Sequence, residues 1–460
     1  MAIEKVAVIG LDCCEPELLF ERWIGDLPNI RALTQNGLHG RLESCMPPIT
    51  VPAWTCMVTG KDPGTLGIYG FRNRRDYSYN EMRTATSLDV REPRVWDLVG
   101  QGGRKSIVVG VPQTFPIVKP PNGCMVSCFL TPSIESDYTH PPTLKRDIAG
   151  WVGEYMVDVK GFRTEDKAWL LEQIYAMTDR RFEVCRQLIR TQPWNLFFMV
   201  EIGVDRIHHG FWQYMDTRHF RYKPGNPYEN AIHDYYVHLD GLIGQLLAEM
   251  DLKKTAVMLV SDHGSKRLEG GVCFNDWLIR EGLLVMKQRA TAPTKFRLED
   301  VDWERTRAWG EGGYYGRCFL NVAGREPQGI VPPAEYEALR NELVAKLEAL
   351  PDPQGKPMGT RAYKPEAIYR QVKGTPPDLL VIFGDLNWRS VGTVGNPEIY
   401  TRDNDTGPDE ANHSQHGIYL VSHPELKAAR RDASIFDVTP TILKMLGQPL
   451  PPGSCGQPLV

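Results

Sequence analysis

Aspartate and histidine residues follow several apolar runs of this 460-residue chain, at the point where each run ends. Asp12 comes directly after the run VAVIGL, and Asp262 and His263 follow the run AVMLV with one serine between. Asp205 and His209 lie four residues apart, shortly after the run LFFMV. One helical turn would place both on one face, where together they can hold a divalent cation. Taken singly, each of these residues could also be a turn residue, a helix cap or a surface pair.

Four further residues affect how such groups could share an ion. Gly264 permits a sharp turn after the adjacent Asp-His pair, and only such a turn lets both side chains reach one cation. His413 and His416 precede the last apolar run, IYLVS, and a histidine here could add a third ligand to the pair spaced by four. A polar loop histidine is the alternative there. His208 points elsewhere on the expected helix, so it is the weaker ligand candidate.

Thr50 is the candidate nucleophile, in the segment PPITVPAWTCMVTG. Pro52 fits an early helical position, so Thr50 is expected at a helix N-terminus. Free backbone N–H groups and the helix dipole favour an anion there, which suits an alkoxide and a phosphoryl oxygen. A simple threonine cap is the alternative for this residue alone. A hydroxyl at a helix start, together with carboxylates and imidazoles at four strand ends, is better explained by one shared site than by packing.

Short apolar runs alternate with helical patterns and must position these residues. The runs predict buried strands at Lys5–Gly10, Ser106–Gly110, Leu196–Val200, Ala256–Val260, Leu379–Phe383 and Ile418–Ser422. Ala168–Ile189 and Tyr228–Met250 carry helical spacing between them. This alternation predicts an α/β fold with a mostly parallel sheet and helices on both faces. In such folds ligands bind at the carboxyl edge of the strands.

A cap or insertion is predicted at Lys287–Lys373, which is richer in proline, glycine and charge and contains one clear helix, Pro333–Leu350. Residues 1–286 and 374–460 would then form the catalytic core. Proline-rich residues 112–142 are expected to be a loop excursion from that core. The length supports this division, because single cores stop growing near about 250–300 residues.

The charge and composition of the chain limit the classes of partner that it is expected to bind. The formal net charge is −4 and the pI about 6.3, so no general attraction to nucleic acid polymers or anionic membranes is expected. The N-terminal sequence MAIEKVAVIGLD does not fit a signal peptide, and no apolar run reaches membrane-spanning length. The ten cysteines include no CxxC pair, which argues against a structural zinc site and favours free thiols in a reducing cytoplasm. The oligomeric state stays open.

The sequence resembles the alkaline phosphatase superfamily, and most closely its type I phosphodiesterase/nucleotide pyrophosphatase branch. The resemblance is carried by VIGLD, PPITVPAWTCMVTGKDPGTLGIYGF, VDRIHHGFW, VSDHG, GREPQGIV and NHSQHGIYL, followed by DVTPTILKMLG. It implies an alkaline-phosphatase-like sandwich with two divalent metals side by side. One metal would be held by Asp12, Thr50, Asp262 and His263, and the other by Asp205, His209 and His413. His413 is preferred because relatives show His-x-x-x-Gly before the final strand; His416 is the alternative.

The resemblance also implies a reaction. Thr50 would attack phosphorus and form a phosphothreonine intermediate, with two metals that are Zn²⁺ or, alternatively, Mn²⁺. Sulfatases carry a Cys/Ser-x-Pro-x-Arg motif that is absent here, and no arginine follows Thr50 to grip a phosphate dianion. Phosphodiesters or nucleotide pyrophosphates are therefore the expected substrates. The Val51 N–H and Asn73 are expected to contact the phosphate. Exposed polar roles are the alternative for Asn73 and for three further candidates, Arg72, Arg74 and Lys266.

Other functions stay open at this point. A phosphomonoesterase or a metal-dependent phosphomutase would share the phosphoenzyme chemistry, and a closed cap would favour transfer by excluding water. A non-catalytic metal- or phosphate-binding protein is a weaker alternative, because every expected ligand type is present. In the cap, Tyr314, Tyr315 and Arg317 could line a leaving-group pocket for a small phosphate ester, or simply form the core of the cap.

Overall fold

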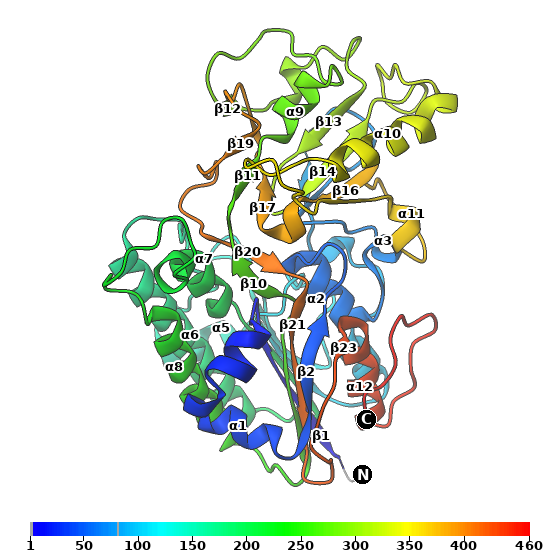
Figure 1. The fold of residues 1–460 in the computed structure, drawn as a ribbon. Helices are drawn as coiled ribbons and strands as arrows, with labels where there is room; N and C mark the ends of the chain where they lie inside the picture. Colours follow the sequence, from blue (N-terminus) through cyan, green and yellow to red (C-terminus); the bar gives the residue numbers. More distant parts are fainter. Residues whose placement is uncertain (1–2, 81) are drawn as a thin grey trace.

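The structure is a computed structural model that describes residues 3–80 and 82–460. A large α/β part lies below a smaller mixed part (Figure 1). The larger part is built on a ten-stranded sheet in the order β22-β2-β21-β9-β1-β8-β5-β6-β7, with β23 beside β2. Its strands are β1 (Lys5–Leu11), β2 (Gly37–Glu43), β5 (Ser106–Val109), β6 (Gly123–Val126), β7 (Thr139–His140), β8 (Leu196–Glu201), β9 (Thr255–Val260), β21 (His416–Ser422), β22 (Ala429–Arg430) and β23 (Ala433–Ser434).

The centre of this sheet is parallel, as the alternation of strands and helices predicts. β1 pairs in parallel with β8 and β9, and β5 continues the parallel set between β8 and β6. The predicted strand at Ile418–Ser422 exists as part of β21, but it runs antiparallel to β9. The chain returns to the sheet from the smaller part, above the carboxyl ends of the parallel strands, so β21 has to run in the opposite direction (Figure 1).

Helices cover both faces of the sheet, again as expected. Alternate β1 residues face opposite layers: Ala7 and Ile9 pack with one apolar cluster, and Val6 and Val8 with another. The first layer contains α1 (Pro28–Thr34), α5 (Leu144–Val152), α6 (Lys167–Thr191), α7 (Gly203–Met215) and α8 (Ala231–Leu247). The second contains α2 (Thr50–Thr59), α4 (Val95–Gln101) and α12 (Val438–Met445). Both helices predicted from apolar spacing correspond to α6 and α8.

The smaller part has its own antiparallel sheet, in the order β13-β14-β16-β15, and its own apolar cluster. Its main elements are α9 (Phe274–Arg280), β13 (Ala308–Glu311), β14 (Gly316–Leu320), α10 (Tyr336–Glu348), β15 (Arg361–Tyr363), α11 (Pro365–Ile368) and β16 (Leu379–Ile382). The prediction that the run at Leu379–Phe383 lies in the central sheet was therefore wrong. A short buried apolar run has the same sequence pattern whether its strand belongs to the central sheet or to the smaller one. The cap boundaries at 287 and 373 stay a prediction. The apolar cluster, which reaches from Val272 to Val394, favours wider limits.

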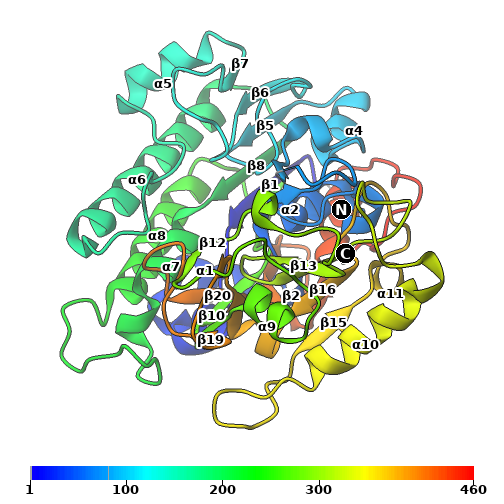
Figure 2. The ribbon, with the colours of Figure 1, turned by 90° about the horizontal axis from the view of Figure 1, so that it is seen from above.

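The remaining short elements connect these two parts or lie at their margins. They are α3 (Pro63–Leu66), β3 (Arg72–Asn73), β4 (Arg83–Thr84), β10 (Gly264–Arg267), β11 (Gly270–Val272), β12 (Thr294–Lys295), β17 (Trp388–Ser390), β18 (Thr393–Val394), β19 (Tyr400–Thr401) and β20 (Ala411–Ser414). Residues 112–142 are more ordered than a loop excursion, since they contribute β6 and β7 to the edge of the central sheet. Seen from above, α9, β13 and β16 lie over the carboxyl edge of that sheet (Figure 2).

Candidate metal centre and nucleophile

Thr50 is the first residue of α2, and Ile49 is the N-cap residue. The threonine is therefore not the helix cap, which was the alternative for it. Its Oγ1 lies 3.2 Å from Nε2 of His263, and the side chain is buried. Val51 follows in the first turn, where backbone N–H groups have no acceptor within the helix. The hydroxyl and these N–H groups thus lie together at the positive end of the helix dipole.

Asp12, Asp262 and His263 form one group of fully buried side chains beside Thr50. One potential ligand atom from each lies within 4.8 Å of the others. Asp12 follows β1, and its Oδ2 accepts a hydrogen bond from Nε1 of Trp54 at 2.7 Å. Asp262 follows β9, and its Oδ1 accepts the Cys13 N–H at 3.2 Å. One oxygen of each carboxylate is therefore held by the protein, while the other faces the group.

The two remaining oxygens are the best indication that this group can hold a cation. Asp12 Oδ1 and Asp262 Oδ2 are buried and have no hydrogen-bond partner within the described residues. Nδ1 of His263 faces the Gly264 carbonyl at 3.1 Å and donates to it, so Nε2 turns its lone pair toward the carboxylates. Burial first, and then the neighbouring charge of Asp262, raise the pKa of Asp12 well above its usual value. Burial likewise raises the pKa of Asp262.

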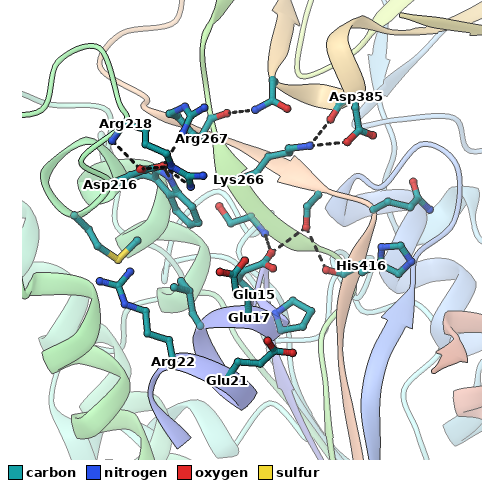
Figure 3. Close-up of a pocket in the computed structure, with 18 of the residues that line it drawn as sticks. Glu15, Glu17, Glu21, Arg22, Asp216, Arg218, Lys266, Arg267, Asp385 and His416 are labelled. Carbon is teal, nitrogen blue, oxygen red and sulfur yellow. Dashed lines mark hydrogen bonds and ion pairs between the residues drawn. The ribbon is translucent and has the colours of Figure 1, made fainter. Parts of the chain in front are cut away.

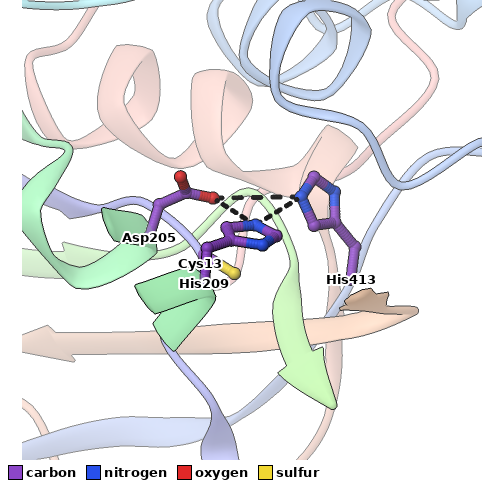
Figure 4. A group of neighbouring side chains, drawn as sticks. All are labelled: Cys13, Asp205, His209 and His413. Carbon is purple, nitrogen blue, oxygen red and sulfur yellow. Dashed lines mark hydrogen bonds and ion pairs between the residues drawn. The ribbon is translucent and has the colours of Figure 1, made fainter. Parts of the chain in front are cut away.

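Asp205, His209 and His413 form a second group, shown in Figure 4. Both residues on α7 point to one side, as their spacing of four predicts, and His413 comes from β20. Oδ1 of Asp205 lies 3.2 Å from Nε2 of His209 and 3.8 Å from Nε2 of His413. The two Nε2 atoms are 3.3 Å apart. Cys13 also belongs to this group, and the sequence analysis did not single it out.

Both histidines of the second group are oriented in the same way as His263. Nδ1 of His209 donates to Oδ1 of Asp409 at 2.6 Å, and Nδ1 of His413 donates to the Pro48 carbonyl at 2.9 Å. Each Nε2 atom is therefore left to face Asp205 Oδ1. Outer acceptors of this kind fix the tautomer and orientation of metal-binding imidazoles. Arg206 binds the other oxygen of Asp205.

In the second group, the charge of each side chain shifts the pKa of its neighbours. Burial opposes protonation of His209, but Asp409 and Asp205 raise its pKa to about 9. Burial also opposes ionisation of Asp205, yet His209 and Arg206 hold its pKa well below the usual value. Burial and the neighbouring imidazoles of His263 and His209 lower the pKa of His413. Without a metal, a proton on His209 is thus the counterion of two buried carboxylates.

A second layer of side chains supports His209 from the cap side. Asp409 accepts hydrogen bonds from Arg163 at 2.8 Å and from the Tyr314 hydroxyl at 2.9 Å. The Tyr314 ring lies 4.4 Å from that of His413 and 5.1 Å from that of His209, centroid to centroid. Asp409 and Arg163 were missed because neither follows a strand or carries a recognisable spacing. Tyr314 was predicted to line a pocket, and it covers the second group.

The remaining histidine candidates lie elsewhere. His208 bonds the Cys13 carbonyl and the Tyr236 hydroxyl, each at 3.1 Å, so it faces away from both groups as expected. His416 lines a separate pocket of about 770 Å³, together with Glu15 and Lys266 (Figure 3). His413 therefore lies with Asp205 and His209, and His416 does not belong to either group among the residues that the structure describes.

The candidates for phosphate contact have other partners. Asn73 closes a turn, because its Oδ1 accepts the Tyr69 N–H at 2.8 Å and its Nδ2 donates to the Gly70 carbonyl at 2.9 Å. Arg74 pairs with Glu326 at 3.2 Å, and Lys266 pairs with Asp385 at 2.8 Å. A phosphate contact of Asn73 stays a prediction that would require this turn to open.

The cap is fixed to the core close to the nucleophile. The Tyr369 hydroxyl donates to the Met46 carbonyl at 2.7 Å, and the Tyr69 hydroxyl donates to the Lys373 carbonyl at 2.6 Å. Tyr315 donates to the Tyr69 carbonyl, so this loop is held from both directions. Tyr69, Tyr315 and Tyr369 belong to one apolar cluster with Ile49, the N-cap residue of α2. The cap therefore closes over the helix start that carries Thr50.

The two groups lie side by side, and their donor atoms are of the kinds that hold divalent cations. The rings of His263 and His413 stack with centroids 3.7 Å apart. Carboxylate oxygens without partners, imidazole lone pairs and a hydroxyl all converge there, and these donors suit Zn²⁺ or Mn²⁺. The charges of Asp262 and Asp205 both raise the pKa of Asp12, and buried like charges are costly unless positive charge compensates them.

Comparisons with known proteins identify the family and the fold. Residues 6–417 match the family described as type I phosphodiesterase / nucleotide pyrophosphatase. A search among curated protein sequences found no match. Human ectonucleotide pyrophosphatase/phosphodiesterase 5 is structurally similar, with 14% identity, a TM-score of 0.56, and 97% of this chain and 96% of that chain covered. The inactive threonine-to-alanine variant of the murine protein, in complex with AMP, gives 13% identity and a TM-score of 0.53 at the same coverage. At these identities the likeness shows a shared fold.

Proposed function

Because the chain belongs to the type I phosphodiesterase/nucleotide pyrophosphatase family of the alkaline phosphatase superfamily, and is therefore a phosphate-ester hydrolase, we propose that Thr50 is its nucleophile. One observation carries the proposal. The Thr50 hydroxyl, at the start of α2, lies 3.2 Å from the Nε2 atom of His263, beside carboxylate oxygens that lack partners among the described residues. A hydroxyl in that position can be activated and can hold a phosphoryl group at the helix N-terminus.

The proposed metal ligands are the two groups of buried side chains. Asp12, Thr50, Asp262 and His263 would hold one cation, and Asp205, His209 and His413 the other. When bound, two such cations lower the pKa of a coordinated hydroxyl and neutralise charge on the phosphoryl and leaving oxygens. Zn²⁺ is the proposed ion and Mn²⁺ the alternative, because mixed imidazole and carboxylate donors suit both.

The protein's own residues carry the covalent steps. Thr50 Oγ1 loses its proton to solvent and attacks phosphorus, so the Oγ1–P bond forms while the bond from phosphorus to the leaving oxygen breaks, and the leaving oxygen takes up a proton from solvent. The first-turn N–H groups of α2, including that of Val51, hold a nonbridging oxygen. The oxygen of a water molecule then attacks phosphorus and stays on the product, while the Oγ1–P bond breaks and Oγ1 takes up one proton of that water.

The proposed substrates are phosphodiesters or nucleotide pyrophosphates. No arginine follows Thr50 to grip the dianion of a monoester, which supports a substrate with one more substituent on phosphorus. The murine structural neighbour was solved with AMP, a nucleoside monophosphate. Tyr314 is a ring from the cap that lies against the second group, and it is the proposed surface for the leaving group.

A phosphomutase is the second candidate, and the closed cap favours it. Thr50 is only 3% exposed and His413 1%, so little water reaches the site in this conformation. Exclusion of water favours transfer to a bound acceptor over hydrolysis. Reaction in ¹⁸O-labelled water distinguishes the two, since only a hydrolase incorporates the label into the released phosphate or phosphomonoester.

We place the protein in the cytoplasm. All ten cysteines are free thiols, and nine of them are buried, which supports a reducing compartment. No helix in the described part of the chain has the length and apolar character needed to cross a membrane.

Thr50→Ala tests the nucleophile, with Thr59→Ala as the matched control on the same helix. Thr59 is also buried, but its hydroxyl donates to the Thr55 carbonyl and lies away from both groups. We expect Thr50→Ala to lower the hydrolysis of a nitrophenyl phosphodiester at least about 1,000-fold with its metal content unchanged. Thr59→Ala should stay within about threefold of wild type. A metal-loaded Thr50→Ala protein of near wild-type rate would refute the assignment.

A further inference from the structure

Cys13 occupies an unusual place between the two groups of side chains. It follows Asp12 directly, and its N–H donates to Asp262 at 3.2 Å, so its backbone is part of the first group. Its Sγ belongs to the second group, where one atom each of Cys13, Asp205, His209 and His413 lie within 4.8 Å of one another. Figure 4 shows the sulfur beside the His209 ring, below the Asp205 carboxylate.

We propose that the Cys13 thiolate is a fourth ligand of the second cation, an inference that rests on the proposed two-metal function. Four donors, one sulfur, two imidazole nitrogens and one carboxylate oxygen, complete the tetrahedral set that Zn²⁺ prefers. Zinc can expand to five ligands, so a substrate oxygen can still be accepted. When the cation binds, the S–H bond breaks, the S–metal bond forms and the proton leaves to solvent.

The neighbouring cysteine shows that burial alone does not explain this position. Cys14 is equally buried, but its Sγ lies 3.5 Å from the Tyr236 hydroxyl, in the layer behind the sheet. The Cys13 thiol donates a hydrogen bond to the Gly264 carbonyl at 3.4 Å, beside the three side chains of the second group. Of two adjacent cysteines, one therefore packs in the core and the other faces three side chains of metal-binding type.

The backbone at Cys13 is unfavourable for a residue with a side chain. Its φ is +67°, in the left-handed region that glycine adopts most easily. The strain alone identifies no ligand, but it makes glycine the right substitute. Cys13→Gly removes the sulfur and should keep or relieve the backbone, so loss of the ligand is separated from loss of the fold.

A thiolate would change which metal the second group prefers. Soft sulfur ligands favour Zn²⁺ and Co²⁺ over Mn²⁺ and Mg²⁺, whereas carboxylate and imidazole donors discriminate less. We therefore expect Cys13→Gly to weaken Zn²⁺ binding at this site at least about tenfold and to change Mn²⁺ binding less than about threefold.

Cobalt spectroscopy tests this inference without relying on activity. Metal-free wild-type protein, Cys13→Gly and the control Cys14→Ala are titrated with Co²⁺, and absorption is followed in the near ultraviolet, where thiolate-to-cobalt charge transfer occurs. We expect two Co²⁺ per chain in all three proteins at saturation. The charge-transfer band should be present in wild type and Cys14→Ala and absent in Cys13→Gly.

The outcomes separate this inference from the function on which it rests. Two bound Co²⁺ without a thiolate band, or a band that persists in Cys13→Gly, would overturn the Cys13 ligand and leave the two-metal site intact. Failure of the wild-type protein to bind Co²⁺ would overturn both. Equal Zn²⁺ affinities of wild type and Cys13→Gly would also count against the thiolate.

Discussion

At the scale of single residues, the histidines of the centre are fixed by their outer partners. Nδ1 of each imidazole faces an oxygen: a carbonyl for His263 and His413, and a carboxylate for His209. These histidines could be singled out from the sequence as candidate ligands because they lie close to apolar runs. The outer partner Asp409 could not, since it lies close to His209 in space but 200 residues away in sequence.

Asp409→Asn should weaken the hydrogen bond that holds the His209 ring in its orientation. An amide is a weaker acceptor for the Nδ1–H than a carboxylate, and it also loses the ion pair with Arg163. We expect a loss of about 10- to 100-fold in affinity for the second metal, measured by calorimetric titration of the metal-free protein. The exposed Asp403, in the same loop, supplies the control Asp403→Asn, which should bind metal like wild type. Unchanged affinity in Asp409→Asn would remove this residue from the centre.

Glu15 predicts a pH dependence of stability. Its carboxylate accepts hydrogen bonds from the Ser265 N–H and the Ser414 hydroxyl, both at 3.0 Å, and burial raises its pKa from 4.5 to about 7. The folded protein therefore keeps a proton that the unfolded chain has already lost, so stability falls as the pH rises from 4.5 to about 7 and is then constant.

Glu15→Gln removes this titration and keeps an oxygen that can accept both hydrogen bonds. Denaturant unfolding of metal-free protein should show the variant gaining about 1–3 kcal/mol over wild type between pH 5 and pH 8. The exposed Glu172 on α6 gives the control Glu172→Gln, which should follow wild type at both pH values. A Glu15→Gln protein whose advantage does not change with pH would contradict the assignment.

At the scale of elements, the ends of strands bring the ligands together. β1 and β9 are adjacent and parallel, so Asp12 and Asp262 meet at one edge of the sheet although 249 residues separate Cys13 from Asp262. This edge was predictable from the apolar runs and the carboxylates that follow them. The direction of β21 was not, because a run of apolar residues carries no information on the direction of its partner strand.

Gly417 in β21 keeps the neighbouring turn in place. A Cβ at this position would lie 2.7 Å from the Ser261 carbonyl oxygen and 3.0 Å from that of His263, so it would push on the turn that carries Asp262. We expect Gly417→Ala to lower the melting temperature and to reduce metal affinity. Gly241→Ala in α8 is the control, since its Cβ meets nothing within 4 Å and should stabilise the helix by about 0.5–1 kcal/mol. Thermal unfolding of both variants, with metal titration, tests the contrast.

At the scale of the whole molecule, the cap and the core share one site. The cap supplies Tyr314 over the second group, and tyrosines from both parts meet beside Ile49 at the start of α2. The insertion predicted at Lys287–Lys373 stays a prediction. The sequence could not assign β16, because Leu379–Ile382 is as apolar as the strands of the central sheet. That pairing depends on distant partners, which no local pattern reveals.

Removal of metal should destabilise the whole chain. Cations bind the folded state only. When the free metal concentration is about a thousandfold above the Kd of a site, binding at that site adds about 4 kcal/mol to the free energy of unfolding. The melting temperature should therefore fall on chelation and recover with Zn²⁺. Asp12→Asn should have opposite effects in the two forms: it lowers the melting temperature with metal present, but raises it without metal by removing one of two repelling carboxylates. An effect of the same sign in both forms would argue against a cation at Asp12.

The central claim is that Thr50 becomes covalently phosphorylated, and rapid-quench mass spectrometry tests it most directly. Metal-loaded protein is mixed with excess phosphodiester and quenched in acid within a single turnover. The protein is then digested, and the mass of the peptide that contains Thr50 is measured. We predict that the phosphoryl group and its retained substituent are found on Thr50 at early times and are lost as product accumulates. Product formation with Thr50 unmodified throughout, or an adduct on another residue, would contradict the account.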